Sequence, residues 1–335
     1  MTTRLYNFNP GPAALPLEVL EEAKEQFVYY GGKGISLLEM SHRSRDVEQL
    51  NEETQQLLLR ALDLEGGNYH VLFMGGGAST QFALLPLNFL KPNETAAYAL
   101  TGSFAEKAYK EASFIGRTHI ITSSRDNGWR HVPDLTESDL PSSPAYVHIT
   151  TNNTIEGSCY KRIPDLGSSA LVGDMTSDLL SRKLDLSKFS LLYAGAQKNL
   201  GPAGVTAVIV RDDFLKQASN DIPTIFRYTT FAQNKSLYNT PPVHSIYMMN
   251  LVLKWFIRQG GITKLEQLNQ QKAELLYRVI DESGGFYKGI IDPPYRSHMN
   301  ITWTMRNEAA EKNFIRESME HGFEGLAGHL QRRWT

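Results

Sequence analysis

Short apolar runs alternate with helix-like segments between residues 69 and 210 of this chain. The runs are rich in Val, Ile, Leu, Tyr and Ala, as buried strands are, and the early segments between them carry apolar residues at helical spacing. This alternation predicts an α/β fold around a mostly parallel central sheet. The predicted strands cover residues 69–73, 96–100, 118–122, 146–150, 169–173, 191–194 and 205–210, with helices at 80–90 and 104–113.

At 335 residues the chain is too long for one ordinary core, and its character changes after Pro241-Pro242. We expect a large domain of residues 16–262 and a smaller α+β domain of residues 1–15 and 263–335. Outside the alternating region, helical patterns cover residues 17–30, 46–64, 246–258, 263–282 and 308–321, and residues 299–304 alternate as a strand does.

The bulk composition excludes several classes of protein. A net charge of −2 gives no nucleic-acid footprint and no polybasic membrane surface. No apolar run is long enough to span a bilayer, and the N-terminus has no stretch typical of a signal peptide. The single cysteine, Cys159, excludes an intramolecular disulfide and fits a reducing compartment. We therefore expect a cytoplasmic protein with neither nucleic-acid nor membrane partners.

Lys198 lies in Tyr193-Ala-Gly-Ala-Gln-Lys-Asn-Leu-Gly-Pro-Ala-Gly204, directly after a predicted strand. Small residues surround it and a Gly-Pro break follows, so we expect the lysine close to the apolar core. Desolvation disfavours its ammonium form, and a neutral amine attacks carbonyl groups. The alternative is an ordinary surface lysine.

Asp174 follows another predicted strand, in Val172-Gly-Asp-Met-Thr-Ser177. A lysine and an aspartate at adjacent strand ends suit pyridoxal 5′-phosphate (PLP), which needs an amine for its aldehyde and a carboxylate opposite its pyridinium nitrogen. Lys198 would also carry the proton between the substrate Cα and the cofactor. The alternative role for Asp174 is that of a helix N-cap.

Three further segments fit the same cofactor. Gly75-Gly-Gly-Ala-Ser-Thr80 follows a strand and opens a helix, an arrangement that binds phosphate, although it would also serve as a flexible turn. It lacks the pattern of a nucleoside-triphosphate loop and of a dinucleotide fingerprint. Thr154 either bonds the cofactor hydroxyl or shapes a turn. Phe104 either stacks on the pyridine ring or belongs to the core.

Ser41-His-Arg43 lies between two predicted helices. Arginine binds phosphate or carboxylate through two hydrogen bonds, and His42 beside Arg43 adds a donor. The alternative is a solvated loop. The remaining histidines and Cys159 lack metal-ligand spacing, so we expect no metal site.

Together these segments resemble the phosphoserine aminotransferases, fold-type I PLP-dependent enzymes of the class V aminotransferase group. The resemblance runs from Tyr6 to His329. It rests on Asn7-Phe-Asn-Pro-Gly-Pro-Ala-Ala-Leu-Pro16, Glu39-Met-Ser-His-Arg43, Val71-Leu-Phe-Met-Gly-Gly-Gly-Ala-Ser-Thr-Gln-Phe82, Asn153-Thr-Ile-Glu-Gly157, the Lys198 segment and Tyr238-Asn-Thr-Pro-Pro242.

The resemblance implies reversible amino transfer from O-phospho-L-serine to 2-oxoglutarate, giving 3-phosphooxypyruvate and glutamate in serine biosynthesis. Some bacterial relatives also act on 4-phosphooxy-L-threonine in pyridoxine synthesis. It implies a homodimer with shared sites. By the same resemblance, the residues take these roles: Lys198 and Asp174 in catalysis; Ala78, Ser79 and Gln197 on the cofactor phosphate; Thr154 on its hydroxyl; Phe104, where many relatives carry tryptophan, on its ring; Asn239 and Thr240 on the phosphate of the other subunit; His42, Arg43 and His329 on the substrate.

The chain departs from the family after Gly325-Leu-Ala-Gly-His329. Relatives continue with an arginine, Gly-Gly, a second arginine, a strand and a closing helix, whereas this sequence continues as Leu330-Gln-Arg-Arg-Trp-Thr335. We interpret the change as a shifted reading frame or an equivalent truncation. It leads us to expect lower stability and weaker substrate binding, and it leaves one alternative: a PLP-binding dimer with impaired turnover.

The sequence disfavours two other class V activities. A cysteine desulfurase needs a cysteine on a mobile loop, and Cys159, beside the Thr154 turn, is a poor candidate. An alanine–glyoxylate type of enzyme is disfavoured by the Ser-His-Arg43 and Gly-His329 segments, which favour a phosphorylated substrate.

Overall fold

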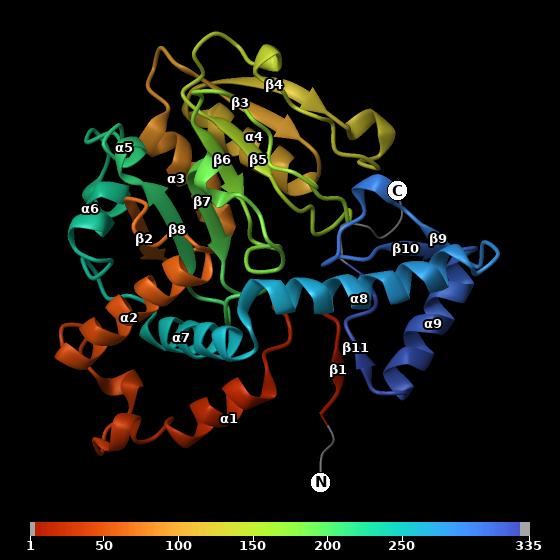
Figure 1. The fold of residues 1–335 in the computed structure, drawn as a ribbon, viewed down its shortest axis with the longest axis horizontal. Coiled ribbons are helices and arrows are strands. Elements are labelled where there is room, and N and C mark those ends of the chain that lie inside the picture. Colours follow the sequence, from red (N-terminus) through yellow and green to blue (C-terminus); the bar gives the residue numbers. More distant parts are fainter. Residues whose placement is uncertain (1–3, 329–335) are drawn as a thin grey trace.

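The computed structural model describes residues 4–328 and places a seven-stranded sheet at the centre of the molecule (Figure 1). The strand order is β2-β8-β7-β6-β5-β3-β4. Each of the seven strands predicted between residues 69 and 210 is present, with boundaries within two residues of those expected. The strands are β2 (Tyr69–Met74), β3 (Thr95–Leu100), β4 (Arg117–Ser123), β5 (Val147–Thr150), β6 (Leu171–Asp174), β7 (Phe189–Gly195) and β8 (Thr206–Arg211).

The sheet is mostly parallel, which confirms the predicted fold class. Strands β4, β3, β5, β6 and β7 pair in parallel. Strand β8 runs antiparallel to both of its neighbours, β7 and β2. The central strands β5, β6 and β7 are buried along their whole length, as expected for mostly apolar strands covered on both faces, although polar residues such as His148 and Ser190 interrupt the apolar runs.

Helices cover both faces of the sheet. Helices α3 (Gly77–Phe89) and α4 (Ser103–Ile115) pack on one face, with Phe82, Leu85 and Ala108 in the apolar layer. Helices α2 (Arg45–Ala61) and α7 (Val243–Arg258) supply side chains to the other layer, among them Leu58 and Met249. Each fully buried side chain of this size contributes about 1.5–3 kcal/mol. The shorter α5 (Asp212–Leu215) and α6 (Tyr228–Gln233) lie at the edge that carries β2 and β8.

The first helix is shorter than its pattern predicts. Helix α1 spans Leu17–Glu25 and buries Val19 and Ala23, whereas Phe27 is half exposed. The chain then folds back on itself, because the Ser36 hydroxyl donates to the Phe27 carbonyl and the Tyr30 amide donates to the Ile35 carbonyl. These loop bonds replace the last turn that the spacing suggested.

The C-terminal lobe contains a two-stranded antiparallel pair and two helices beside it. Its elements are α8 (Gly261–Asp281), β9 (Tyr287–Gly289), β10 (Trp303–Met305), α9 (Glu308–Glu320) and β11 (Phe323–Glu324). Strand β11 pairs in parallel with β1 (Tyr6–Asn7), so the N-terminal arm joins this lobe. The predicted strand 299–304 is reduced to β10, because Asn300 and Thr302 before it bond to Asn152 and Glu156 in the loop after β5 instead.

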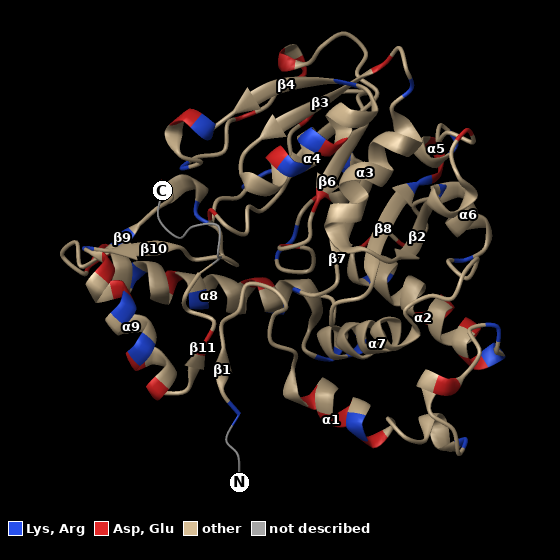
Figure 2. Cartoon of the chain, turned by 180° about the vertical axis from the view of Figure 1, so that it is seen from behind, with Lys and Arg blue, Asp and Glu red and all other residues tan. Residues whose placement is uncertain are grey.

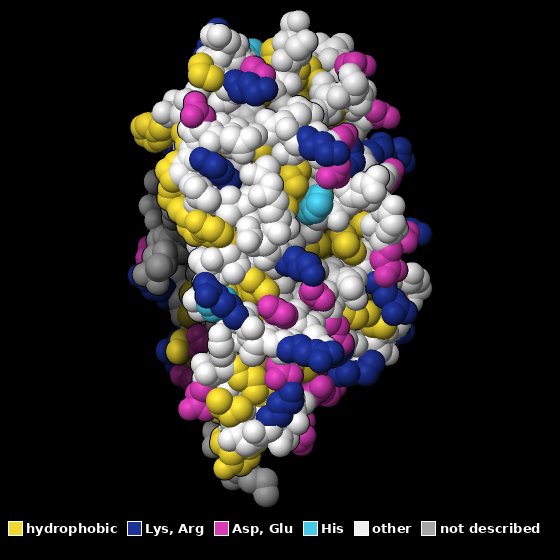
Figure 3. All heavy atoms as spheres, turned by 90° about the vertical axis from the view of Figure 1, so that its left-hand side faces the viewer, with side chains coloured by type: hydrophobic (Ala, Val, Ile, Leu, Met, Phe, Trp, Pro, Cys, Tyr) yellow, Lys and Arg dark blue, Asp and Glu magenta, His cyan; other side chains and the backbone are white. Residues whose placement is uncertain are grey.

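Charged residues of both signs are spread over the outer helices, while the central strands carry few (Figure 2). Figure 3 shows the side that carries α2, α5 and α6, with hydrophobic side chains gathered along one edge and at the lower end. Within residues 4–328, none of the helices has both the length and the apolar content needed to cross a bilayer.

Candidate active site

The predicted site residues follow three neighbouring parallel strands. Thr154 comes after β5, Asp174 ends β6, and Lys198 comes after β7. The order β7-β6-β5 places these three strand ends side by side at the carboxyl edge of the sheet, where open α/β sheets bind their ligands. The fold therefore brings together residues that are 44 positions apart.

Lys198 is the chemically distinctive group at this edge. Its Nζ donates a hydrogen bond to Thr154 Oγ1 and lies 5.8 Å from the centre of the Phe104 ring. Its stem packs beneath Gly11, where a Cβ would lie 3.0 Å from both Cγ and Cε of the lysine. Burial lowers the pKa of Lys198 to about 8, although the carboxyl groups of Asp174 and Asp178 act in the opposite direction. The neutral fraction at pH 7 thus rises by roughly two orders of magnitude over a surface lysine.

Asp174 is almost fully buried, with 4% of its surface exposed. Its Oδ1 accepts a hydrogen bond of 3.0 Å from the Thr176 amide, so part of its capacity is used in a local turn. Burial raises the pKa of Asp174, and the hydrogen bonds from Thr176 and the charge of Lys198 partly offset this. A cationic partner placed here would relieve the cost of burying the carboxylate.

The glycine-rich segment forms the turn that leads into α3. Gly76 has φ of +91°, and a Cβ there would lie 1.9 Å from Thr80 Oγ1, so the position requires glycine. No side chain among residues 4–328 caps this helix, which leaves the first amides available to an anion. Ala78 is partly buried and Ser79 exposed in this first turn. Gln197, beside Lys198, accepts a 2.8 Å backbone bond from Ala13.

His42, Asn239 and Thr240 form a second cluster. Thr240 Oγ1 lies 3.4 Å from His42 Nδ1, and Asn239 Nδ2 donates to the Thr240 carbonyl at 3.4 Å. His42 Nε2 is shielded from solvent and has no hydrogen-bond partner among residues 4–328, whereas the adjacent Arg43 is exposed. His329 lies outside the described residues, as do Arg332 and Arg333.

Comparison with known proteins decides the family. The sequence profile Aminotransferase class-V matches residues 5–322. The chain belongs to the class-V aminotransferase family. The phosphoserine aminotransferase of Niallia circulans is 53% identical over 98% of this chain and 91% of its own length, and that of Lysinibacillus sphaericus is 50% identical with the same coverage.

Solved structures agree with this assignment. The phosphoserine aminotransferase from Bacillus circulans subsp. alkalophilus superimposes with a TM-score of 0.95 at 51% identity, covering 98% of this chain and 91% of that one. A PLP-bound phosphoserine aminotransferase from Trichomonas vaginalis gives a TM-score of 0.91 at 31% identity, covering 98% and 93%. The fold-type I architecture expected from the sequence is thereby confirmed.

The carboxyl edge of this aminotransferase is chemically suited to PLP. It offers a lysine of depressed pKa, a buried carboxyl group whose pKa burial raises and the charge of Lys198 lowers, and an uncapped helix N-terminus. These are the groups needed for an aldehyde, a pyridinium nitrogen and a phosphate.

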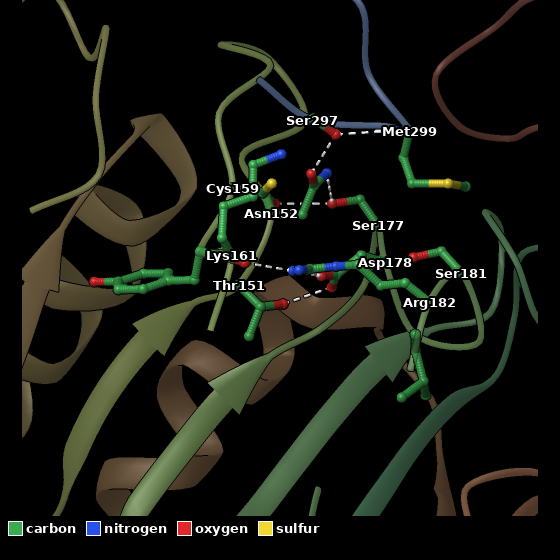
Figure 4. A network of polar contacts seen from close by, with 12 residues as sticks. Thr151, Asn152, Cys159, Lys161, Ser177, Asp178, Ser181, Arg182, Ser297 and Met299 are labelled. Atoms are coloured by element: carbon green, nitrogen blue, oxygen red, sulfur yellow. Dashed lines mark hydrogen bonds and ion pairs between the residues drawn. The ribbon is translucent and has the colours of Figure 1, made fainter. Parts of the chain in front are cut away.

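Asp178 is a second buried acid whose charge acts on Lys198, and it was not predicted from the sequence. Asp178 accepts from Thr151 Oγ1 at 2.5 Å and from Arg182 Nη2 at 3.0 Å (Figure 4). Burial raises the pKa of Asp178, while Arg182 and then Thr151 act to lower it. The spacing of four residues between Asp178 and Arg182 was the available signal, since an acid and a base four positions apart often pair where the chain turns, and here they do so in a non-helical turn.

The same network reaches the C-terminal lobe. Asn152 Nδ2 donates to Ser177 Oγ at 2.8 Å, and Ser297 Oγ donates to Asn152 Oδ1 at 2.5 Å (Figure 4). Asn152 Nδ2 also donates to Asn300 Oδ1 at 2.8 Å. These contacts explain why residues 299–302 leave the strand pattern. They also fix the lobe against the strand ends that carry Thr154 and Asp174.

Proposed function

We propose that this class-V aminotransferase transfers the amino group of O-phospho-L-serine to 2-oxoglutarate, giving 3-phosphooxypyruvate and L-glutamate, with PLP as cofactor. The observation that carries the proposal is the meeting of Lys198, Thr154 and Asp174 at one sheet edge, in a chain about half identical to phosphoserine aminotransferases. The comparisons give no support to the alternative of a PLP-binding dimer with impaired turnover.

Each residue at the edge has a role in this reaction. Lys198 would hold PLP covalently, and its amine would move the proton at the substrate Cα. Asp174 would pair with the ring nitrogen, Thr154 would bond the ring hydroxyl and Phe104 would stack on the ring. Ala78, Ser79 and Gln197 would hold the phosphate. Bound in this way, PLP supplies an electron sink for the substrate carbanion.

The substrate groups would be held by His42, Arg43 and His329. Arginine and histidine donors suit a phosphate, and each charge-assisted bond contributes about 1.5–3 kcal/mol. The same pocket would admit 4-phosphooxy-L-threonine, which differs from phosphoserine in its carbon skeleton but keeps the phosphate and the amino acid groups.

The purified protein with PLP should convert phosphoserine and 2-oxoglutarate to glutamate, whereas unphosphorylated serine should be slower by about a hundredfold or more in kcat/KM, because two charge-assisted contacts are lost. A coupled glutamate assay measures both. Equal use of serine or alanine, or sulfide release from cysteine, would favour the other class V activities instead.

The protein would act as a homodimer in which the His42–Thr240 cluster completes the partner's site. Of the 21 exposed large hydrophobic side chains among residues 4–328, ten lie between Leu5 and Leu38. An apolar surface gathered in one segment marks a protein interface, and a symmetric dimer would cover it twice.

Shared sites give a complementation test. Lys198→Ala and His42→Ala homodimers should each be nearly inactive. Refolded together they should regain about a quarter of wild-type activity, because half of the dimers are mixed and each mixed dimer holds one intact site. If the mixture stays as inactive as its parents, His42 acts within its own subunit.

We also assign residues 16–262 to a large PLP-binding domain and residues 1–15 and 263–335 to a small one. The β1–β11 pairing supports grouping the N-terminal arm with the C-terminal lobe. Cytoplasmic localisation is supported by the free, buried thiol of Cys159.

A further inference from the structure

Glu156 is a buried acid that the proposed reaction does not use. It is 1% exposed, and its Oε1 accepts from the Ser103 amide at 3.0 Å and from the Ser103 hydroxyl at 2.6 Å. Its Oε2 has no hydrogen-bond partner within residues 4–328. The carboxyl group therefore faces the first turn of α4 from outside that helix.

Helix α4 depends on this outside contact for its N-terminal cap. The N-cap residue is Gly102, which has no side chain to accept from the first amides. A Cβ at Gly102 would lie 2.5 Å from Asn153 Oδ1 and 2.6 Å from Glu156 Oε2. A side chain at position 102 would thus push Glu156 away, and glycine lets the carboxyl group replace the missing cap at the positive end of the helix.

The first turn of α4 carries Phe104, and the turn that contains Glu156 carries Thr154; both are predicted site residues. Phe104 is the second residue of α4, and Lys198 Nζ lies 5.8 Å from its ring centre. Thr154, two positions before Glu156, accepts the hydrogen bond from Lys198. Glu156 therefore links the turn that carries Thr154 to the helix that carries Phe104, and both of these side chains lie beside Lys198.

The turn is also fixed from its other side. The Gly157 amide donates to the Asn153 carbonyl at 2.7 Å, which closes the turn. Thr302 Oγ1 donates to the Glu156 carbonyl at 2.6 Å, and the Ser297 amide donates to the Gly157 carbonyl at 2.8 Å. Because hydrogen bonds hold the Asn153–Gly157 turn on the side away from α4, the position of Glu156 relative to α4 is fixed.

We propose that Glu156 is a positioning residue, which caps α4 from the Thr154 turn and so sets Phe104 and Thr154 at a fixed spacing around Lys198. The proposal rests on the proposed function for its meaning, because Phe104 and Thr154 are the groups assigned to the cofactor ring. The capping contact itself is independent of any reaction.

The test compares Glu156→Ala and Glu156→Gln with a matched control, Asn307→Ala. Asn307 caps α9 by accepting from the Ala310 amide at 2.9 Å, and α9 and α4 both have 13 residues. Hydrogen exchange on the full chain, with and without PLP, reports the first-turn amides of each helix. Titration with PLP gives the cofactor Kd, and steady-state kinetics separates kcat from KM.

In Glu156→Ala, amide exchange at residues 103–106 should speed up about tenfold, and the PLP Kd should rise by a similar factor. Glu156→Gln keeps an acceptor oxygen and should change both by less than about threefold. Asn307→Ala should speed exchange in α9 and leave the Kd unchanged. If Glu156→Ala does not fold, Ser103→Ala, which removes only the 2.6 Å bond, should change both quantities about threefold.

Unchanged exchange in α4 would overturn the capping role. Faster exchange with an unchanged Kd would overturn the link to the site, and so would an equal rise of the Kd in Asn307→Ala. If the wild-type protein bound no PLP, the proposed function would fail, while the exchange data would still decide whether Glu156 caps α4.

Discussion

Replacing Lys198 with alanine should lower the transamination rate by about 10⁴-fold or more, because one amine both holds the cofactor and transfers the proton at the substrate Cα. The structure supports this dual role through the depressed pKa of Lys198, about 8, and through its contact with Thr154. Initial rates at saturating PLP measure the loss. Added methylamine should restore part of the rate, since a small amine fits the space that the side chain leaves.

Borohydride reduction followed by peptide mapping identifies the lysine directly. The wild-type protein should carry a pyridoxyl label at position 198, and Lys198→Ala should carry none. Lys254→Ala is the control, because Lys254 pairs with Glu53 at 2.9 Å on the surface. A label on a different lysine, or near-normal turnover in Lys198→Ala, would contradict the proposed chemistry.

Asp174→Asn should reduce kcat by about 10²- to 10³-fold and leave the fold intact, as expected when one partner of a buried charge pair is lost. The asparagine keeps an acceptor for the Thr176 amide but offers no charge to the ring nitrogen. The cofactor-free variant should unfold at the same temperature as wild type or higher, because the carboxyl group no longer has to be desolvated.

Asp178→Asn is the matched comparison for stability. Its partner Arg182 is only 12% exposed and would be left buried without an opposite charge. We expect a loss of about 3–5 kcal/mol in the free energy of unfolding, measured by urea denaturation. Equal destabilisation by both variants would mean that Asp174 is a structural acid like Asp178.

The pH dependence gives an independent check on Asp174. Its charge supports the ammonium form of Lys198, so removing it should move the titration midpoint of the lysine below the wild-type value of about 8. In the cofactor-free protein, the rate at which Lys198 reacts with a small amine-reactive electrophile, measured against pH, reports this midpoint. A midpoint that stays in place or rises would exclude electrostatic coupling between the two groups.

The strands and the positions of Lys198, Asp174 and Thr154 could be predicted from the sequence. Buried strands are recognised as apolar runs, and polar residues that follow parallel strands meet at the carboxyl edge of the sheet. The direction of β8 could not, since an apolar run has no direction. Strands β1 and β11 are two residues each and too short for a pattern.

The supporting residues were missed for a different reason. Asp178 and Glu156 look like ordinary acids in the sequence, and their burial depends on Arg182 and on the N-terminus of α4, which only the folded chain brings near. The grouping of His42 with Thr240, 198 positions apart, is likewise a product of tertiary structure.

The N-terminal arm has a practical consequence for anyone handling this protein. Within a few residues it passes from the β1–β11 pair to Gly11 against the Lys198 stem and to the Ala13 bond on Gln197. Deletion of the N-terminal arm up to Ala13 would therefore remove the packing of Gly11 against the Lys198 side chain, although the sequence gives no warning of this effect. An N-terminal affinity tag should therefore be attached through a long spacer. Proteolytic cleavage within the N-terminal arm should abolish activity while the rest of the protein is still folded.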